Sequence, residues 1–132
     1  MTPNIPLDLC VSRLRDDYLS GSRTPCGVVA DILEAQKTHD ENPIWIHRVD
    51  DSDLMARARS LEAMSQDGLP LYGIPFAVKD NIDVAGLPTT AACPEFSYIA
   101  GETAPAVQLL LDAGAILIGK TNLDQFATGL VG

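Results

Sequence analysis

Lys79 is the residue whose type and position most directly suggest chemistry. It closes an apolar run, residues 74–78, that has the composition of a strand. A charged ammonium at the end of a buried strand is costly, so it needs either a path to solvent or a neutral form. Desolvation lowers the pKa of a lysine from its usual value of about 10.4, and a neutral amine can accept a proton from a hydroxyl. We therefore expect Lys79 to be desolvated and to act as a base. A strand-end lysine that simply reaches water is the alternative.

The polar residues near Lys79 and beyond it suggest structural roles. If the strand continues, Asp80 points away from Lys79, which favours a hydrogen-bonding role over direct catalysis. Thr89 and Thr90 are expected to hydrogen-bond the loop in which they lie. Lys120 follows a second apolar run, at a strand end where α/β folds commonly place sites, and we expect it to organise a loop.

Three helices are predicted upstream of Lys79. Apolar residues recur at helical spacing over 7–18, with Gly21 as the stop. Residues 24–25, Thr-Pro, resemble a helix cap followed by the first helical position, and Ser52 is expected to cap the third helix. Residues 44–46 are a candidate for a short strand or a buried loop. The inward positions of the third helix are predicted to be Leu54, Ala58, Leu61 and Met64.

The pattern changes at residue 71. Residues 71–78 are predicted to form a strand, and Gly73 and Pro75 within it favour an edge position or a bulge. The later elements are predicted as a short strand at 81–84, a surface loop at 89–101, a helix that starts at Thr103 and stops at Gly114, and a strand at 115–118. A strand, a helical crossover and a second strand form a right-handed unit with parallel strands.

The predicted fold class is therefore α/β. Residues 1–70 are interpreted as an N-terminal helical segment, and 71–132 as the first α/β part of the same domain. Parallel sheets are covered by helices on both faces, and this chain supplies only a few strands and helices. We expect the domain to be incomplete here and to need its remainder or a companion chain.

Composition argues against several classes of protein. A net charge of -9 disfavours nucleic acid and anionic membrane surfaces as partners. The sequence has neither an apolar run of about 20 residues nor a signal-peptide pattern, so we expect a cytoplasmic location. Cys10, Cys26 and Cys93 are widely spaced, and neither His39 nor His47 belongs to a recognisable ligand set. No metal site or cofactor is predicted, and Cys93 has no nearby histidine in the sequence to activate it.

The sequences GIPFAVKDNIDVAGLPTTAA at 73–92 and ETAPAVQLLLDAGAILIGKTNLDQFATG at 102–129 resemble the amidase signature family of serine hydrolases. The resemblance implies a Ser–cis-Ser–Lys triad with Lys79 as the base. Its two serines belong to a Gly/Ser-rich segment downstream of the GKTN motif, and Ser97 lies upstream in the wrong context. We therefore expect this chain to hold only the lysine and to be inactive alone. The resemblance also implies that Gly129 and Leu130 approach the acyl pocket.

Two stretches narrow the resemblance to the subgroup that hydrolyses allophanate (urea-1-carboxylate) to ammonia and carbon dioxide. They are ENPIWIHRVDDSDLMARARSLE at 41–62 and TTAACPEFSY at 89–98. The implied partners are a small amide substrate and, in a homodimer, a second copy of the chain. Three alternatives remain: another amidase of the family, an amidotransferase subunit acting on glutaminyl-tRNA, and a truncated non-catalytic assembly module.

Overall fold

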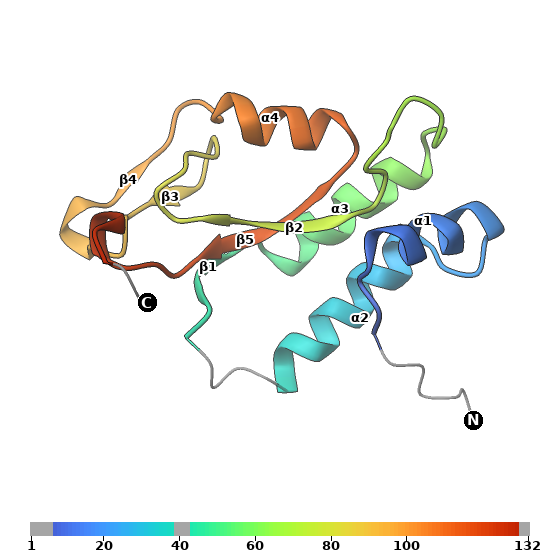
Figure 1. Ribbon diagram of the computed structural model, residues 1–132, viewed down its shortest axis with the longest axis horizontal. Helices are drawn as coiled ribbons and strands as arrows, with labels where there is room; N and C mark the ends of the chain where they lie inside the picture. The colour runs from blue at the N-terminus through green and yellow to red at the C-terminus, as the bar shows by residue number, and fades with distance from the viewer. Residues whose placement is uncertain (1–6, 39–42, 130–132) are drawn as a thin grey trace.

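Figure 1 shows the computed structural model of the protein, which describes residues 7–38 and 43–129. The elements are α1 (Val11–Ser20), α2 (Pro25–Thr38), β1 (Trp45–Arg48), α3 (Asp51–Glu62), β2 (Pro75–Lys79), β3 (Pro88–Thr89), the 3-10 helix η1 (Pro94–Phe96), β4 (Tyr98–Ile99), α4 (Pro105–Asp112), β5 (Ile116–Thr121) and the 3-10 helix η2 (Gln125–Ala127). Among the described residues, every helix is too short or too polar to cross a membrane. The α/β fold class is confirmed.

The larger sheet has the strand order β1-β5-β2. β5 runs parallel to β2 and antiparallel to β1, so β2, α4 and β5 form the predicted parallel unit. β2 lies at the edge of this described sheet, and its pairing with β5 shifts by one residue between Phe76 and Ala77. This confirms the edge position and the irregularity inferred from Gly73 and Pro75. β3 and β4 form a separate two-stranded ribbon.

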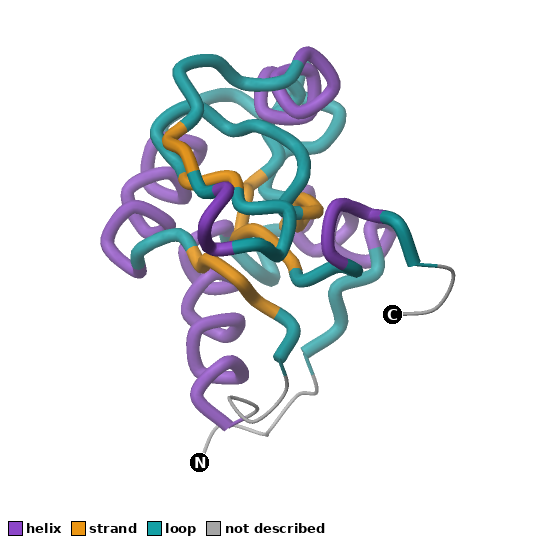
Figure 2. Tube along the Cα trace, turned by 90° about the vertical axis from the view of Figure 1, so that its left-hand side faces the viewer, coloured by secondary structure: helices purple, strands orange, loops and turns teal. Residues whose placement is uncertain are grey.

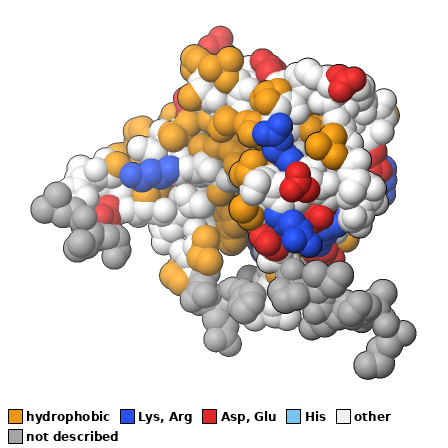
Figure 3. Space-filling model, turned by 45° about the vertical axis from the view of Figure 1, so that its right-hand side comes forward, with side chains coloured by type: hydrophobic (Ala, Val, Ile, Leu, Met, Phe, Trp, Pro, Cys, Tyr) orange, Lys and Arg blue, Asp and Glu red, His pale blue; other side chains and the backbone are white. Residues whose placement is uncertain are grey.

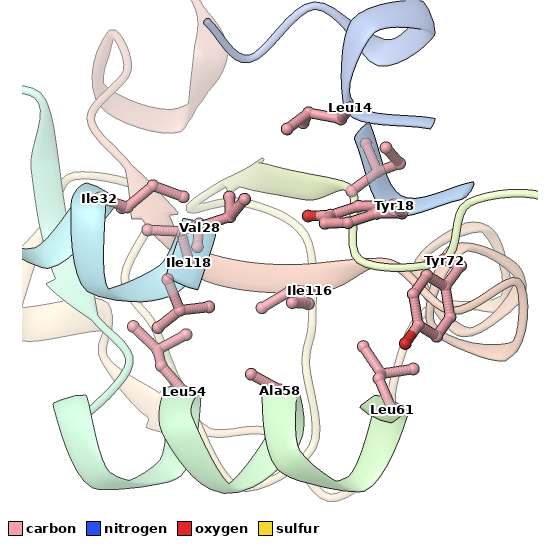
Figure 4. Close-up of a cluster of buried hydrophobic side chains, with 12 residues drawn as sticks. Leu14, Tyr18, Val28, Ile32, Leu54, Ala58, Leu61, Tyr72, Ile116 and Ile118 are labelled. Atoms are coloured by element: carbon pink, nitrogen blue, oxygen red, sulfur yellow. The ribbon is translucent and has the colours of Figure 1, made fainter. Parts of the chain in front are cut away.

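Helices cover both faces of the larger sheet. In Figures 1 and 2, α4 lies on the opposite side of the sheet from α2 and α3. The helical side holds the main apolar core, shown in Figure 4, which comprises Leu14, Tyr18, Val28, Val29, Ile32, Leu54, Ala58, Leu61, Tyr72, Ile74, Ile116 and Ile118. The α4 side holds a smaller cluster of Val78, Val84, Val107 and Leu117. At the surface, Figure 3 shows hydrophobic side chains gathered in a band on the face viewed.

Local sequence sets the helix ends. Gly21 ends α1 in the left-handed conformation, with φ of 77°, and its N–H bonds to the Tyr18 carbonyl. The Thr24 hydroxyl accepts a hydrogen bond of 3.1 Å from the N–H of Gly27 at the start of α2. Both of these ends were predicted correctly. The cap assigned to Ser52 is wrong, because α3 begins at Asp51 and its capping residue is Asp50.

Two further predictions are wrong in detail. Met64 lies beyond the end of α3 and is 51% exposed, because the helix stops at Glu62 before Met64 can join the buried face. Residues 81–84 do not form a strand: the chain turns directly after β2, where the Ile82 N–H bonds to the Lys79 carbonyl at 3.0 Å, and residues 83–84 are irregular. Asn81 and Asp83 are residues that favour turns over strands, which explains why β2 ends where it does.

Candidate active site at the carboxyl ends of β2 and β5

Lys79 is the last residue of β2, and its backbone pairs with Thr121, the last residue of β5. Its side chain is exposed among the described residues, so the expected desolvation is wrong for this chain. Strand alternation gives the reason. Val78 and Asp80 are buried toward α4, whereas Ala77 and Lys79 point to the opposite face, which is open at this end of β2.

The buried lysine of this chain is Lys120, in β5. Lys120 and Asp80 are both fully buried, and Lys120 Nζ lies 2.8 Å from Asp80 Oδ1. The same Nζ donates to the Pro88 carbonyl at 3.0 Å and to the Thr89 hydroxyl at 3.3 Å. The ammonium thus has three partners, which compensates for its removal from water. The loop-organising role predicted for Lys120 is confirmed, since Pro88 and Thr89 form β3 at the start of residues 88–92, which we call the 88–92 loop.

The local sequence does not mark Lys120 as the buried lysine, because both Lys79 and Lys120 close an apolar run. The one-residue shift in the β2–β5 pairing determines which of the two lysines is buried. Phe76 pairs with Leu117, but Val78 pairs with Lys120 instead of Gly119. Side chains alternate along a strand, so this shift turns Lys120 toward the face of Val78.

Gly119 lies at this irregularity and allows β1 to approach closely. A Cβ at Gly119 would lie 2.5 Å from the His47 carbonyl oxygen and 3.0 Å from the Arg48 Cα. Any side chain here would push β1 away from β5. The glycine before Lys120 is therefore needed for the packing that positions the buried lysine.

Each polar group of Asp80, in the side chain and in the backbone, has a hydrogen-bond or ion-pair partner. Its Oδ1 faces Lys120, and its Oδ2 accepts hydrogen bonds from both the N–H and the hydroxyl of Thr90. Its N–H donates to the Thr121 carbonyl at 3.1 Å, and its carbonyl accepts from the Ala91 N–H at 3.0 Å. The structural roles predicted for Asp80 and Thr90 are confirmed.

The polar network continues from Thr89 toward the surface. The Thr89 hydroxyl donates to Asp83 Oδ1 at 2.9 Å, and the Tyr98 hydroxyl donates to the same oxygen at 2.7 Å. These two hydrogen bonds, that of Tyr98 first, hold the pKa of Asp83 below its ordinary value. The hydrogen bond from Tyr98 raises the pKa of that phenol in return. Asp83 therefore ties the β3–β4 ribbon to the turn after Lys79.

A pocket of about 360 Å³ lies beside this network, lined by Ile46, Thr90, Ala92, Pro94, Ser97 and Asn122. Ala91 and Ala92 have φ of 50° and 61°, a left-handed conformation that is uncommon for residues other than glycine. The Ala91 carbonyl accepts a hydrogen bond of 2.9 Å from the Phe126 N–H, which joins this loop to η2. Strained backbone and a pocket thus occur together where α/β folds bind ligands, at the carboxyl ends of parallel strands.

The other candidates are placed as follows. Gly129 is exposed after η2, and a Cβ at this position would meet the Asp124 carboxylate, so the Asp124 side chain would have to shift. Leu130 lies outside the described residues. Cys93 has its thiol 3.4 Å from a Glu95 carboxylate oxygen. Within the described ranges, no group of three His, Cys, Asp or Glu side chains could hold a metal ion.

Comparison with known proteins assigns the family. The family model described as Amidase matches residues 28–132. The urea amidolyase of Lachancea kluyveri is 54% identical over 102 residues, which are 76% of this chain and 6% of that protein. The Kluyveromyces lactis allophanate hydrolase structure is 48% identical, with a TM-score of 0.74 over 89% of this chain and 20% of that one. The peptide amidase of Stenotrophomonas maltophilia is 27% identical, with a TM-score of 0.80 over 96% of this chain and 26% of that one.

The chain therefore belongs to the amidase signature family. Within that family it is similar to urea amidolyases and to allophanate hydrolase at about half sequence identity. It spans only 6% of the length of the first of these curated relatives and 20% of the solved allophanate hydrolase chain.

Proposed function

We propose that the protein carrying this chain hydrolyses amides with Lys79 as the general base, and that its substrate is allophanate. The observation that carries this proposal is the position of Lys79. It ends β2 with its side chain on the open face of the strand, while the next residue, Asp80, is buried and held on all sides. A lysine presented in this way is available to a reacting group on that face.

The proposed chemistry is acyl transfer. The Lys79 amine takes a proton from a bridging serine, which in turn takes one from the nucleophilic serine. The nucleophile attacks the amide carbonyl, and the proton held by Lys79 passes back through the bridging serine to the leaving nitrogen, which departs as ammonia. Water then hydrolyses the acyl-enzyme, with the same lysine and serine accepting its proton and returning it to the nucleophilic serine. Both serines are assigned by the family resemblance, outside residues 1–132. Lys79 must be neutral to act as a base, so the proposal requires that other parts of the domain cover the face on which it is now exposed.

Relatives support allophanate as the substrate. Urea amidolyase and allophanate hydrolase share about half of their aligned residues with this chain, whereas the peptide amidase shares 27%. A purified full-length protein should release ammonia from allophanate with kcat/KM at least about 100-fold above that for acetamide or a peptide amide. Equal turnover of all three substrates would contradict this assignment. The homodimer, the cytoplasmic location and the role of Gly129 stay predictions.

The role of Lys79 is tested by substitution in the full-length protein. Lys79→Ala should lower kcat for amide hydrolysis by about 10³-fold or more, because the serines lose the group that removes their proton. The matched control is Lys37→Ala, which removes a lysine from α2 whose side chain is 70% exposed. The control should keep the activity of the unmodified protein, and both variants should melt at its temperature. Retained turnover in Lys79→Ala would reject the proposal.

A further inference from the structure

We propose that the buried Asp80–Lys120 ion pair is the positioning device of the site: it sets the direction of Lys79 and the shape of the 88–92 loop together. This inference rests on the proposed function of Lys79 as the base. Neither Asp80 nor Lys120 touches the reacting atoms in this scheme, so both are positioning residues.

The direction in which the Lys79 side chain points depends on the next residue, Asp80. Asp80 is joined to Lys79 by a peptide bond, and its backbone N–H and carbonyl are bonded to Thr121 and Ala91. Its side chain is fixed inward by Lys120 and Thr90. Because neighbouring side chains on a strand point to opposite faces, an Asp80 locked inward obliges Lys79 to point outward.

The same pair shapes one wall of the pocket. Lys120 holds the start of the loop through the Pro88 carbonyl and the Thr89 hydroxyl, and Asp80 holds its middle through Thr90. Thr90 Oγ1 also accepts a hydrogen bond of 3.1 Å from the Ala92 N–H. Thr90 and Ala92 both line the pocket. One ion pair therefore connects the lysine that does the chemistry to the loop beside it.

Stability alone does not account for a pair buried this completely. Removing two charges from water is costly, and well-packed apolar residues of similar volume often replace such a pair without loss of stability. What apolar residues cannot reproduce is direction, since the four side-chain hydrogen bonds that Asp80 and Lys120 make here each fix an angle as well as a distance. The geometry points to placement of Lys79 as the function of the pair.

The test uses the full-length protein and compares three variants in ammonia release from allophanate. Lys120→Met keeps the length of the side chain but removes its charge and its three contacts. The double variant Asp80→Asn with Lys120→Gln has no charge but keeps donors and acceptors for Thr90 and Pro88. Arg13→Met is the matched control, because it removes a cation from the surface pair Arg13–Asp17 on α1.

We expect kcat of Lys120→Met to fall by about 100-fold, the effect of a displacement of about 1 Å in a catalytic group, with KM changed by less than about threefold. The kcat of the double variant should be at least about tenfold higher than that of Lys120→Met. The Arg13→Met control should have the kcat of the unmodified protein. Each variant is assayed well below its own melting temperature, so that a loss of folded protein is not read as a loss of kcat.

The outcomes separate this inference from the proposed function. If Lys79→Ala is inactive and a folded Lys120→Met keeps kcat within threefold, the positioning role is rejected while the base is retained. If Lys79→Ala is active, the proposed function itself fails. If Lys120→Met does not fold, the kcat of the double variant tests the positioning role instead. If it folds and keeps at least a tenth of the original kcat, the positioning role is supported; if its kcat falls by 100-fold or more, the role is rejected.

Discussion

The two sides of the sheet are built in different ways. Among the described residues, the helical side is an apolar core of twelve buried residues from α1, α2, α3, β5 and the segment just before β2. In this core the Tyr18 hydroxyl donates to the Gly73 carbonyl at 2.7 Å. In the part of the chain that the structure describes, the α4 side has a smaller apolar cluster of four buried residues. Beside that cluster lie three fully buried polar residues, Asp80, Thr89 and Lys120.

The contrast separates stability from geometry. Apolar packing is non-directional and roughly proportional to the area removed from water, so it stabilises a fold without fixing single atoms tightly. Hydrogen bonds and ion pairs in a buried network fix both distances and angles. The helical side therefore supplies the stability of this chain, and the network side supplies the placement of Lys79. Three substitutions test this division.

The largest expected effect is on the helical side. Leu54 on α3 is 2% exposed and lies in the main core, so Leu54→Ala should lower the free energy of unfolding by about 3 kcal/mol. Leu54 contacts neither Lys79 nor the Asp80–Lys120 network in the described structure, so kcat per folded molecule should stay unchanged. Urea denaturation followed by circular dichroism, together with ammonia release, measures both quantities.

Leu109→Ala is the control for this substitution. Leu109 lies on α4 and is 70% exposed, so the same change of residue should cost less than about 0.5 kcal/mol. A stable but inactive Leu54→Ala variant would mean that the two sides of the sheet are not separable.

Tyr18 gives an intermediate effect that depends on pH. Tyr18→Phe leaves the Gly73 carbonyl without its donor, at a cost of about 1–2 kcal/mol near pH 7. Burial raises the pKa of Tyr18 well above its ordinary value. Above about pH 10 an unfolded tyrosine loses its proton while the buried one keeps it, so the stability of the unmodified protein falls as pH rises.

The Tyr18→Phe variant should lose less stability between about pH 8 and pH 11, measured by urea denaturation at each pH. The free energy of unfolding of the variant should still fall somewhat as pH rises, because burial also raises the pKa of Tyr72. An unchanged slope in Tyr18→Phe would show that Tyr18 is not protected in the folded state.

The smallest expected effect is at the outer end of the polar network. Tyr98→Phe removes the larger of the two hydrogen bonds that lower the pKa of Asp83, so this pKa should rise part of the way to its ordinary value. A carboxyl group whose pKa is lower in the folded state than in the unfolded state stabilises the folded protein at pH values above the unfolded-state pKa. This stabilisation is lost as the pH falls through the folded-state pKa. The free energy of unfolding of the Tyr98→Phe variant should therefore change less with pH in this acidic range than that of the unmodified protein.

The measurement for Asp83 is an NMR titration of its carboxyl carbon. Glu95 serves as the internal reference, because its lowered pKa comes from its own backbone N–H and from Cys93, which the substitution leaves in place. If Asp83 titrates as before in Tyr98→Phe, the bond from Tyr98 does not contribute to the network.

Much of the fold could be predicted from the sequence because its signals are local. Gly21 and Pro25 mark helix boundaries through backbone conformations that belong to those residue types. Leu54, Ala58 and Leu61 follow helical spacing, and all three are buried. Ser52, Met64 and the 81–84 segment were placed wrongly, since each depends on where an element ends, and a difference of one or two residues changes which side chains are buried.

The candidate site was only partly predictable. Lys79 closes the strand as expected, and Asp80 turns inward as alternation requires. The burial of Lys120 and the exposure of Lys79 were missed, because the two lysines have the same local sequence signal. The pocket beside the 88–92 loop was missed as well. The left-handed Ala91 and Ala92 had no signal, since alanine does not favour that conformation.

The sequence by itself determined the parallel β2–α4–β5 unit, the edge position of β2 among the described strands and the placement of Lys79 at its end, since periodicity, Gly and Pro act within a few residues. Only the tertiary structure decided which lysine is buried. Asp80 and Lys120 are distant in the chain, and they meet because β5 pairs beside β2 with a shift of one residue. A register between distant strands depends on their packing as a whole, so neither strand alone encodes it.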